Sequence, residues 1–148
     1  CPYPELTPSE NLAPYVVDSD SIDPPEGKYE KAALNCQAAD STNSQLFKVV
    51  GAIEDPDGDR LYYHWYVDWS ELFPVDPVND PDGLEPEDQF IDQEWTVTCE
   101  EDFAGATESG WHVIELLVTD RPLLSARFQG LEDGAPSLRI VWFLEVER

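Results

Sequence analysis

Residues 46–69 read LFKVVGAIEDPDGDRLYYHWYVDW. The apolar run at 46–53 is rich in β-branched and aromatic residues, which predicts a strand. The Asp-Pro and Asp-Gly pairs at 55–59 predict a turn. In the run at 61–69 the aromatic residues fall on both faces, which indicates a central strand that is packed on both sides. Two strands joined by a tight turn indicate a β-rich domain.

The same pattern recurs along the rest of the chain, with turn residues between the runs and no long amphipathic helix. In the run at 89–98 we expect Trp95 and Val97 to face the core. Two Pro- and Asp-rich connections, 70–88 and 121–136, are long enough to be functional or mobile loops. We therefore predict an all-β fold, an immunoglobulin-like β-sandwich of about seven strands with long loops. The further expected strands are 12–18, 34–38, 89–98, 111–119 and 138–146.

The charge is strongly negative, with 32 acidic against 8 basic residues and a net charge of −24. Nucleic acid is excluded as a partner because its phosphates would be repelled, and direct binding to anionic lipid headgroups is excluded for the same reason. Three interpretations remain open: a solvated surface that resists aggregation, divalent cation binding, or a basic protein partner.

The chain begins with Cys1 and contains no methionine. A mature chain that begins with cysteine is what signal peptidase II leaves on a bacterial lipoprotein. We therefore expect a diacylglyceryl and acyl lipid on Cys1, which would anchor the protein in the bacterial cell envelope, at the outer membrane. The alternative is an arbitrary chain boundary that falls on a cysteine. Residues 1–11 contain three prolines and predict an extended tether, and residues 12–148 form the folded domain.

Three cysteines are an odd number for a secreted protein. If Cys1 carries lipid, Cys36 and Cys99 are left to pair as a disulfide in an oxidising compartment. The bridge would close a loop of about 60 residues and stabilise the fold by ~4 kcal/mol in the chain-entropy model. A metal site is the weaker alternative, because no CxxC motif is present and neither histidine has ligand-like spacing to a cysteine.

The DPDGD turn at 55–59, Trp65 and the run HVIELLVTD at 112–120 resemble PKD-type and cadherin-like immunoglobulin-fold domains of bacterial secreted proteins. The likeness extends to lipoproteins of myxobacteria-like lineages. It covers about half of the chain, and it implies the fold more strongly than the function, because such domains serve many roles. The two long loops and the expected disulfide depart from a plain PKD-type module.

Asp55, Asp57 and Asp59 alternate across the turn, and Asp120 ends a strand that should neighbour it. Carboxylate and carbonyl oxygens are the ligands that Ca²⁺ prefers, so these four residues are a candidate calcium site. The alternative is an ordinary turn whose Asp side chains cap backbone N–H groups. The turn is not an EF-hand, because the terminal bidentate Glu is missing. The acidic run at 80–88 is a second candidate.

The aromatic residues Tyr63, Tyr66 and Trp69 could form an exposed face that binds a glycan or a protein. The alternative, which the sequence favours, is that the long loops bury them.

No GxSxG, HExxH or phosphate-binding motif is present, and His64 and His112 stand beside no nucleophile motif. We therefore expect no enzymatic activity and no required cofactor. The expected function is a membrane-anchored, non-catalytic lipoprotein, which serves as a binding module or accessory subunit of a cell-envelope protein assembly. A carbohydrate-binding or adhesion module, with Ca²⁺, is the alternative, and an enzyme accessory domain is a third.

Overall fold

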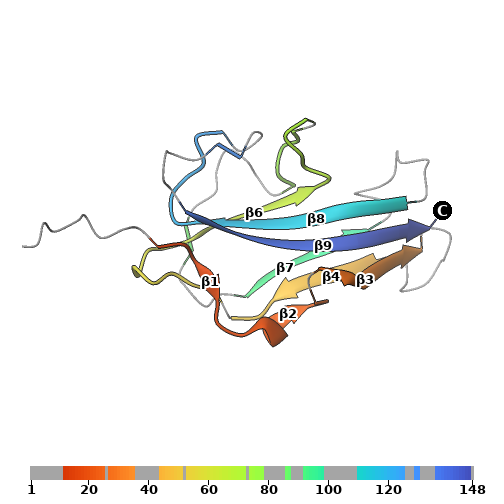
Figure 1. Ribbon diagram of the computed structural model, residues 1–148, viewed down its shortest axis with the longest axis horizontal. Helices are drawn as coiled ribbons and strands as arrows, with labels where there is room; N and C mark the ends of the chain where they lie inside the picture. The colour runs from red at the N-terminus through yellow and green to blue at the C-terminus, as the bar shows by residue number, and fades with distance from the viewer. Residues whose placement is uncertain are drawn as a thin grey trace, which may run out of the picture.

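In the computed structural model, the described residues form β-strands and one short 3₁₀ turn (Figure 1). This confirms the all-β class. At 27–35, 110 and 147 only the backbone is described. Within the described residues, no helix is both long and apolar enough to span a bilayer. The structure describes residues 12–25, 27–35, 44–51, 53–72, 74–78, 86–87, 92–98, 110–125, 129–130 and 136–147.

The described strands form three sheets, ordered β1-β5, β2-β4-β7 and β3-β9-β8-β6. All pairings are antiparallel except that of β3 with β9, which run parallel. The elements are β1 (Tyr15–Val16), η1 (Ser19–Ser21), β2 (Ile22–Asp23), β3 (Gly27–Asn35), β4 (Ser44–Val49), β5 (Ile53–Glu54), β6 (Tyr62–Val67), β7 (Gln93–Thr98), β8 (Gly110–Thr119) and β9 (Ser137–Glu147).

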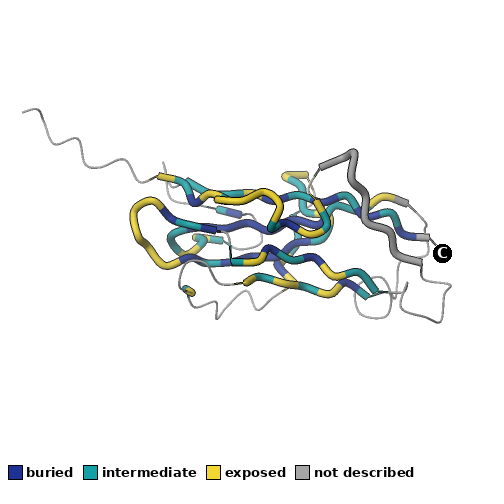
Figure 2. Tube along the Cα trace, turned by 90° about the horizontal axis from the view of Figure 1, so that it is seen from below, coloured by how far each residue is buried: buried dark blue, intermediate teal, exposed yellow. Residues whose placement is uncertain are grey.

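One hydrophobic cluster draws residues from both larger sheets. Phe47 and Val97 come from the three-stranded sheet, and Trp65 and Trp142 come from the four-stranded sheet. Trp142 lies at the centre, stacked on Trp65 at 5.6 Å between ring centroids and tilted against Phe47 at 5.3 Å. Trp65 is therefore part of the hydrophobic core. Along β9, buried residues alternate with less buried ones between Ile140 and Val146, as period-two side-chain placement requires, and Figure 2 shows the buried positions gathered along the strands.

The opposite face of the four-stranded sheet is also largely buried. Side chains of β6 and β8 that point away from the core cluster, such as Tyr66 and Leu117, are 0% exposed. Loop residues cover them: Gln129 donates from Nε2 to Glu115 Oε2 at 3.0 Å. Arg139 Nη1 donates to the carboxylate of Glu115 and the side-chain oxygen of Gln129. Gln129 is thus held on the sheet by a partly buried polar network.

Strand β6 is packed on both faces, as expected, but it is not central. It forms the edge of its sheet, and chain segments from the long loop cover that edge. Val78 donates its backbone N–H to the Trp65 carbonyl at 2.8 Å, and Leu61 forms an antiparallel bridge with Glu87. These contacts satisfy backbone groups that an open edge would expose.

Several strand boundaries differ from the sequence expectation. The run at 46–53 is divided because Gly51 adopts a φ of 56°, so that the chain leaves β4 and resumes as β5. The first expected strand, 12–18, is reduced to β1, which pairs with β5. The region 19–27, expected as loop, contains η1 and β2, and β3 begins at Gly27 rather than near Leu34. In β7, Val97 is buried and Glu94 is exposed, so the expected facing of that strand is confirmed.

Candidate functional site

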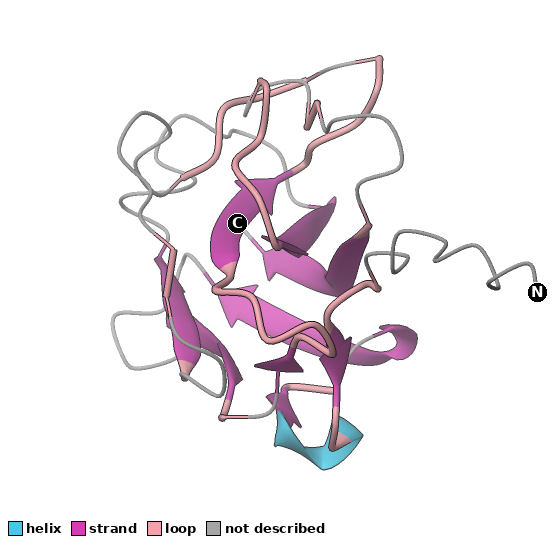
Figure 3. Ribbon diagram, turned by 90° about the vertical axis from the view of Figure 1, so that its left-hand side faces the viewer, coloured by secondary structure: helices cyan, strands magenta, loops and turns pink. Residues whose placement is uncertain are grey.

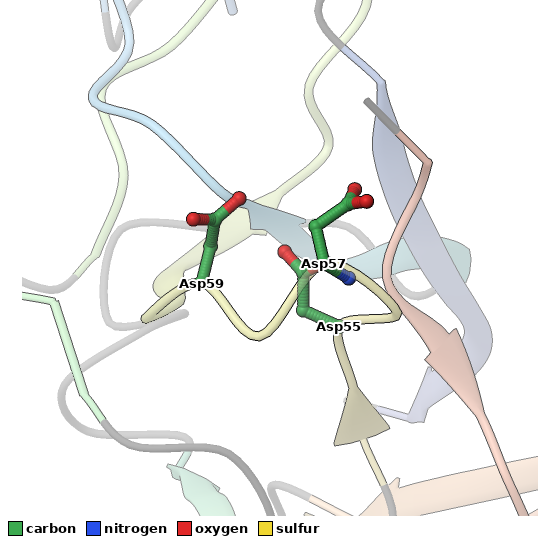
Figure 4. Close-up of side chains that lie close together, drawn as sticks. All are labelled: Asp55, Asp57 and Asp59. Atoms are coloured by element: carbon green, nitrogen blue, oxygen red, sulfur yellow. The ribbon is translucent and has the colours of Figure 1, made fainter. Parts of the chain in front are cut away.

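The acidic turn begins where β5 ends. Asp55 Oδ1 accepts the Asp57 backbone N–H at 2.7 Å, and the Gly58 N–H bonds to the Asp55 carbonyl at 3.1 Å. Gly58 has a φ of 78°, a conformation that glycine adopts without a steric penalty. The turn brings carboxylate oxygens of Asp55, Asp57 and Asp59 within 4.8 Å of one another (Figure 4).

Asp55 is the buried member of this trio, 2% exposed, while Asp57 and Asp59 are exposed. Burial is the largest cause of a raised pKa at Asp55, and the negative charges of Asp59, Asp120 and Asp57 add to it. The hydrogen bond from the Asp57 N–H acts in the opposite direction. A cation at the turn would relieve this repulsion, because opposite charge favours the ionised carboxylate.

Asp120 lies close enough to the turn to raise the pKa of Asp55, but it is not one of the three residues whose oxygens gather there. Its side chain is 1% exposed, and its Oδ1 lies 3.4 Å from Nε of Arg121. The structure therefore brings together three of the four residues expected for the calcium site and places the fourth beside them.

The chain that precedes β1 is attached to the same turn. The Leu12 backbone N–H donates to Asp57 Oδ2 at 2.7 Å. Nearby in the sequence, the Tyr15 hydroxyl donates to Glu54 Oε2 at 2.6 Å, and that hydrogen bond is the main cause of the raised pKa of Tyr15. These two hydrogen bonds join residues that are 45 and 39 positions apart in the sequence, respectively. They hold the start of the described chain against the end of β5 and the turn that follows it.

The aromatic trio expected from the sequence is mostly enclosed. Tyr63 is 4% exposed within the core, where burial raises its pKa to about 12. Tyr66 is 0% exposed, and burial followed by the charge of Glu115 raises its pKa. Trp69 is partly buried. Its ring centroid lies 6.4 Å from that of Tyr66 and 5.8 Å from Cζ of the Arg139 guanidinium. The two tyrosine rings therefore offer no open face to a glycan or protein, and Tyr66 lies under the loops.

Among the described residues, Trp111 at the start of β8 is the most exposed aromatic residue, with 56% of its surface exposed. Sequence reasoning did not single it out. The period of two places Trp111 on the opposite face from Ile114 and Leu116, which both belong to the core cluster. Leu117 lies on the same face as Trp111 and is 0% exposed, so the alternation alone does not predict this exposure.

The two histidines have different surroundings. His64 is 3% exposed, and burial lowers its pKa to about 4. His112 Nδ1 lies 2.6 Å from Asp68 Oδ2, and Asp68 Oδ1 also accepts the Val113 backbone N–H at 2.8 Å. Asp68 has a φ of 54°, in the left-handed region that few non-glycine residues adopt. No motif in the sequence indicates that Asp68 and His112 meet.

A surface hollow of about 500 Å³ lies beside η1 and β2, a region that the sequence predicts as loop. The residues that line it include Asp18, Asp20, Asp23 and Lys48. No motif in the sequence points to it, because Lys48 reaches the hollow only through the pairing of β2 with β4.

Some expected site residues lie outside the described residues: Cys1, Cys36, Cys99 and most of the acidic run at 80–88. Lipidation of Cys1, the Cys36–Cys99 disulfide and the second acidic cluster stay predictions. Comparisons of this chain with protein-family models, with curated proteins and with solved structures found no match.

Proposed function

We propose that this chain is a non-catalytic binding domain that recognises a positively charged protein partner. The observation that carries the proposal is the net charge of −24. In the part of the chain that the structure describes, the exposed basic residues are Arg60 and Arg139. Exposed carboxylates far outnumber them there: Asp18, Asp20, Asp23, Asp57, Asp59, Asp68, Glu71, Asp76, Glu87, Asp92 and Glu94. Such a surplus steers a basic protein toward the surface and repels an acidic one.

The proposed scaffold is an immunoglobulin-like sandwich. The neighbour order β6-β8-β9 and the pair β4-β7 correspond to strands C-F-G and B-E of that fold. Trp65 on β6 occupies the place of its core tryptophan. In this scaffold, binding surfaces lie on loops and strand edges, where the exposed carboxylates of this chain are also found.

The proposal predicts a saturable, salt-sensitive complex with a basic probe. A synthetic nonapeptide with three arginines separated by glycine and serine is expected to bind at one site. Calorimetry should show a 1:1 complex whose affinity falls steeply as salt rises through about 0.15 M. The matched control is the same peptide with glutamate in place of arginine, which should not bind. Heat that never saturates, or equal binding of both peptides, would contradict the proposal.

A second candidate function is a calcium-dependent adhesion module. The observation that favours it is the trio of Asp55, Asp57 and Asp59, whose buried member is held beside like charges. Ca²⁺ takes six to eight oxygen ligands and accepts carboxylates readily. Since Asp57 also accepts the Leu12 N–H, a bound ion would sit where the chain enters the domain.

Millimolar Ca²⁺ is expected to raise the melting temperature relative to chelator. At a hundredfold excess over Kd the gain is about 2.7 kcal/mol, which corresponds to roughly 5–10 °C for a domain of this size. Asp55→Asn should abolish the response, because it removes the buried charge but keeps a side-chain oxygen for the Asp57 N–H. The raised pKa of Asp55 means that its ionisation opposes folding at neutral pH, so ion-free Asp55→Asn should be at least as stable as the parent.

The control for this experiment is Asp92→Asn, which changes an exposed carboxylate outside the turn. It should keep the full response to Ca²⁺. The calcium proposal fails if chelator and Ca²⁺ give the same melting temperature, or if Asp55→Asn responds as the parent does.

A further inference from the structure

The outer face of the four-stranded sheet, which points away from the core cluster, is covered at one end and open at the other. The register of β8 with β9 places Leu117 opposite Arg139 at the covered end and Trp111 opposite Glu145 at the open end. Leu117 is 0% exposed, whereas Trp111 is 56% exposed. In Figures 1 and 3 described loop segments lie over this sheet on the side away from η1, and in Figure 1 the first residues of β8 extend beyond them.

The open end presents a group of apolar side chains, which we call the Trp111 patch. Strand pairing brings Trp111 and Val113 of β8 beside Val141 and Phe143 of β9. Phe143 lies directly opposite Val113 and diagonal to Trp111, a position within reach of an aromatic ring. Val113, Val141 and Phe143 are each partly exposed. Apolar surface that a folded protein leaves open in this way marks a contact surface for another molecule.

Carboxylates border the Trp111 patch on two sides. Glu145 lies directly opposite Trp111 on β9. Just after β6, Asp68 Oδ1 accepts a backbone N–H of β8 at 2.8 Å, and its Oδ2 lies 2.6 Å from Nδ1 of His112. The Asp68 side chain remains 45% exposed. Among the described side chains of β6, β8 and β9, Arg139 is the one lysine or arginine, and it pairs with a carboxylate at the covered end.

The charge of the chain decides between the possible occupants of this patch. A second copy would bring another net charge of −24 against the same border, so that like charges would meet across the interface. Nucleic acid is disfavoured for the same reason. A basic protein gains twice, because its apolar side chains become buried against the patch while its cationic side chains meet the bordering carboxylates.

We propose that the Trp111 patch is the surface on which the basic partner protein docks. The inference rests on the proposed function and specifies where the partner binds. Trp111 is the central anchor, since a tryptophan that becomes buried in an interface contributes more to binding than most other contacts. The partner presents an apolar side chain to Trp111 and Phe143, and an arginine or lysine on either side of it meets Glu145 and Asp68.

The test compares two basic peptides by calorimetry. The first is the arginine nonapeptide, and the second carries leucine in place of one glycine beside the central arginine. The leucine peptide should bind about tenfold more tightly, the scale expected when a leucine side chain is buried. In ¹⁵N-labelled protein it should shift the Trp111 indole N–H and the amides of Val113 and Phe143. A leucine peptide with glutamate in place of arginine should bind at least about tenfold more weakly than the basic one.

Two pairs of variants separate the patch from the rest of the surface. Trp111→Ala should weaken binding of the leucine peptide about tenfold. Leu124→Ala should leave it unchanged, because Leu124 is 69% exposed but lies on the connection after β8. Glu145→Gln should weaken binding about threefold, the range typical of exposed ion pairs. Glu94→Gln removes an exposed charge from the other sheet and should leave the affinity unchanged.

The amide spectrum of each variant reports whether the fold is intact. If Trp111→Ala does not fold, Trp111→Phe takes its place. It keeps a ring at this position and should weaken binding of the leucine peptide about threefold.

The docking proposal is overturned if the Trp111 variant and Leu124→Ala bind the leucine peptide equally, or if the acidic leucine peptide binds as well as the basic one. It is also overturned if light scattering shows a dimer that the Trp111 variant abolishes, since a second copy then occupies the patch. If both basic peptides bind with shifts on another surface, the docking proposal fails while the proposed function stands. If neither basic peptide binds, both proposals fail.

Discussion

Trp142→Ala is expected to lower the free energy of unfolding by about 3–5 kcal/mol, a large share of the total for a domain of this size. Trp142 is 1% exposed and packs between Phe47 of β4 and Trp65 of β6, so its ring joins the two larger sheets. Its indole N–H also donates to the Pro24 carbonyl. The substitution therefore leaves a cavity and removes that donor from a backbone oxygen.

Urea denaturation followed by circular dichroism measures this loss. Trp111→Ala is the matched control, because it removes the same side chain from a position that is 56% exposed, and it should cost about 0.5 kcal/mol or less. If the alanine variant does not fold, Trp142→Phe keeps a ring between the sheets and should show a smaller loss. Equal losses for Trp142→Ala and Trp111→Ala would show that the core is not centred on Trp142.

Acid is expected to destabilise the fold through His64. Burial lowers the pKa of His64 to about 4, below the ordinary value of 6.5. Between pH 6.5 and pH 4, His64 is protonated in the unfolded chain but stays neutral in the folded protein. The free energy of unfolding therefore falls as the pH drops from 6.5 to 4. At about 1.4 kcal/mol for each unit of pKa, the loss between pH 7 and pH 4 is about 3 kcal/mol.

The structural cause is the absence of a good site for an imidazolium. His64 Nδ1 is buried without a hydrogen-bond partner among the described residues. Its Nε2 lies 3.4 Å from Thr119 Oγ1, and that hydroxyl already donates to the Arg121 carbonyl at 2.8 Å. In a charged ring, Nε2–H has only the long contact to Thr119 Oγ1 as an acceptor and Nδ1–H has none among the described residues, so the loss of hydration is poorly compensated.

The measurement is the free energy of unfolding between pH 7 and pH 4 for the parent and for His64→Gln. The variant should lose about 3 kcal/mol less stability over this range, because its side chain does not titrate. Asp55 acts in the opposite direction, since a raised carboxyl pKa adds stability as the pH falls. That contribution is present in both proteins and cancels in the comparison. Parallel pH profiles would refute the assignment to His64.

Local chemistry accounts for the parts of the fold that the sequence predicted well. The strands around Phe47, Trp65, Val97 and Leu116 were expected because long apolar runs with period-two facing have few alternative structures. By contrast, β2 has only two residues, and Ile22 becomes part of a strand only because it pairs with Val49 of β4. Such a short segment carries no periodic signal of its own.

The candidate sites also fall into those that local sequence predicts and those that depend on tertiary packing. Asp55, Asp57 and Asp59 were found from the sequence because a five-residue turn holds them together. Burial of Tyr66 was the favoured interpretation of the sequence, and the structure has Tyr66 at 0% exposure. The hollow that joins Asp20 to Lys48 was not foreseen, because its sides are 28 residues apart in the chain.

The amino-acid sequence by itself determined the all-β class, the acidic turn and the negative charge, because each depends on composition or on residues close together in the chain. Only the tertiary structure decided which sheet faces are covered and which charges meet. The Glu115–Gln129–Arg139 network and the hollow beside η1 both arise where loops or short strands pack on residues distant in sequence. Local periodicity specifies which face of a strand is apolar, but the packing of the whole chain selects what lies against it.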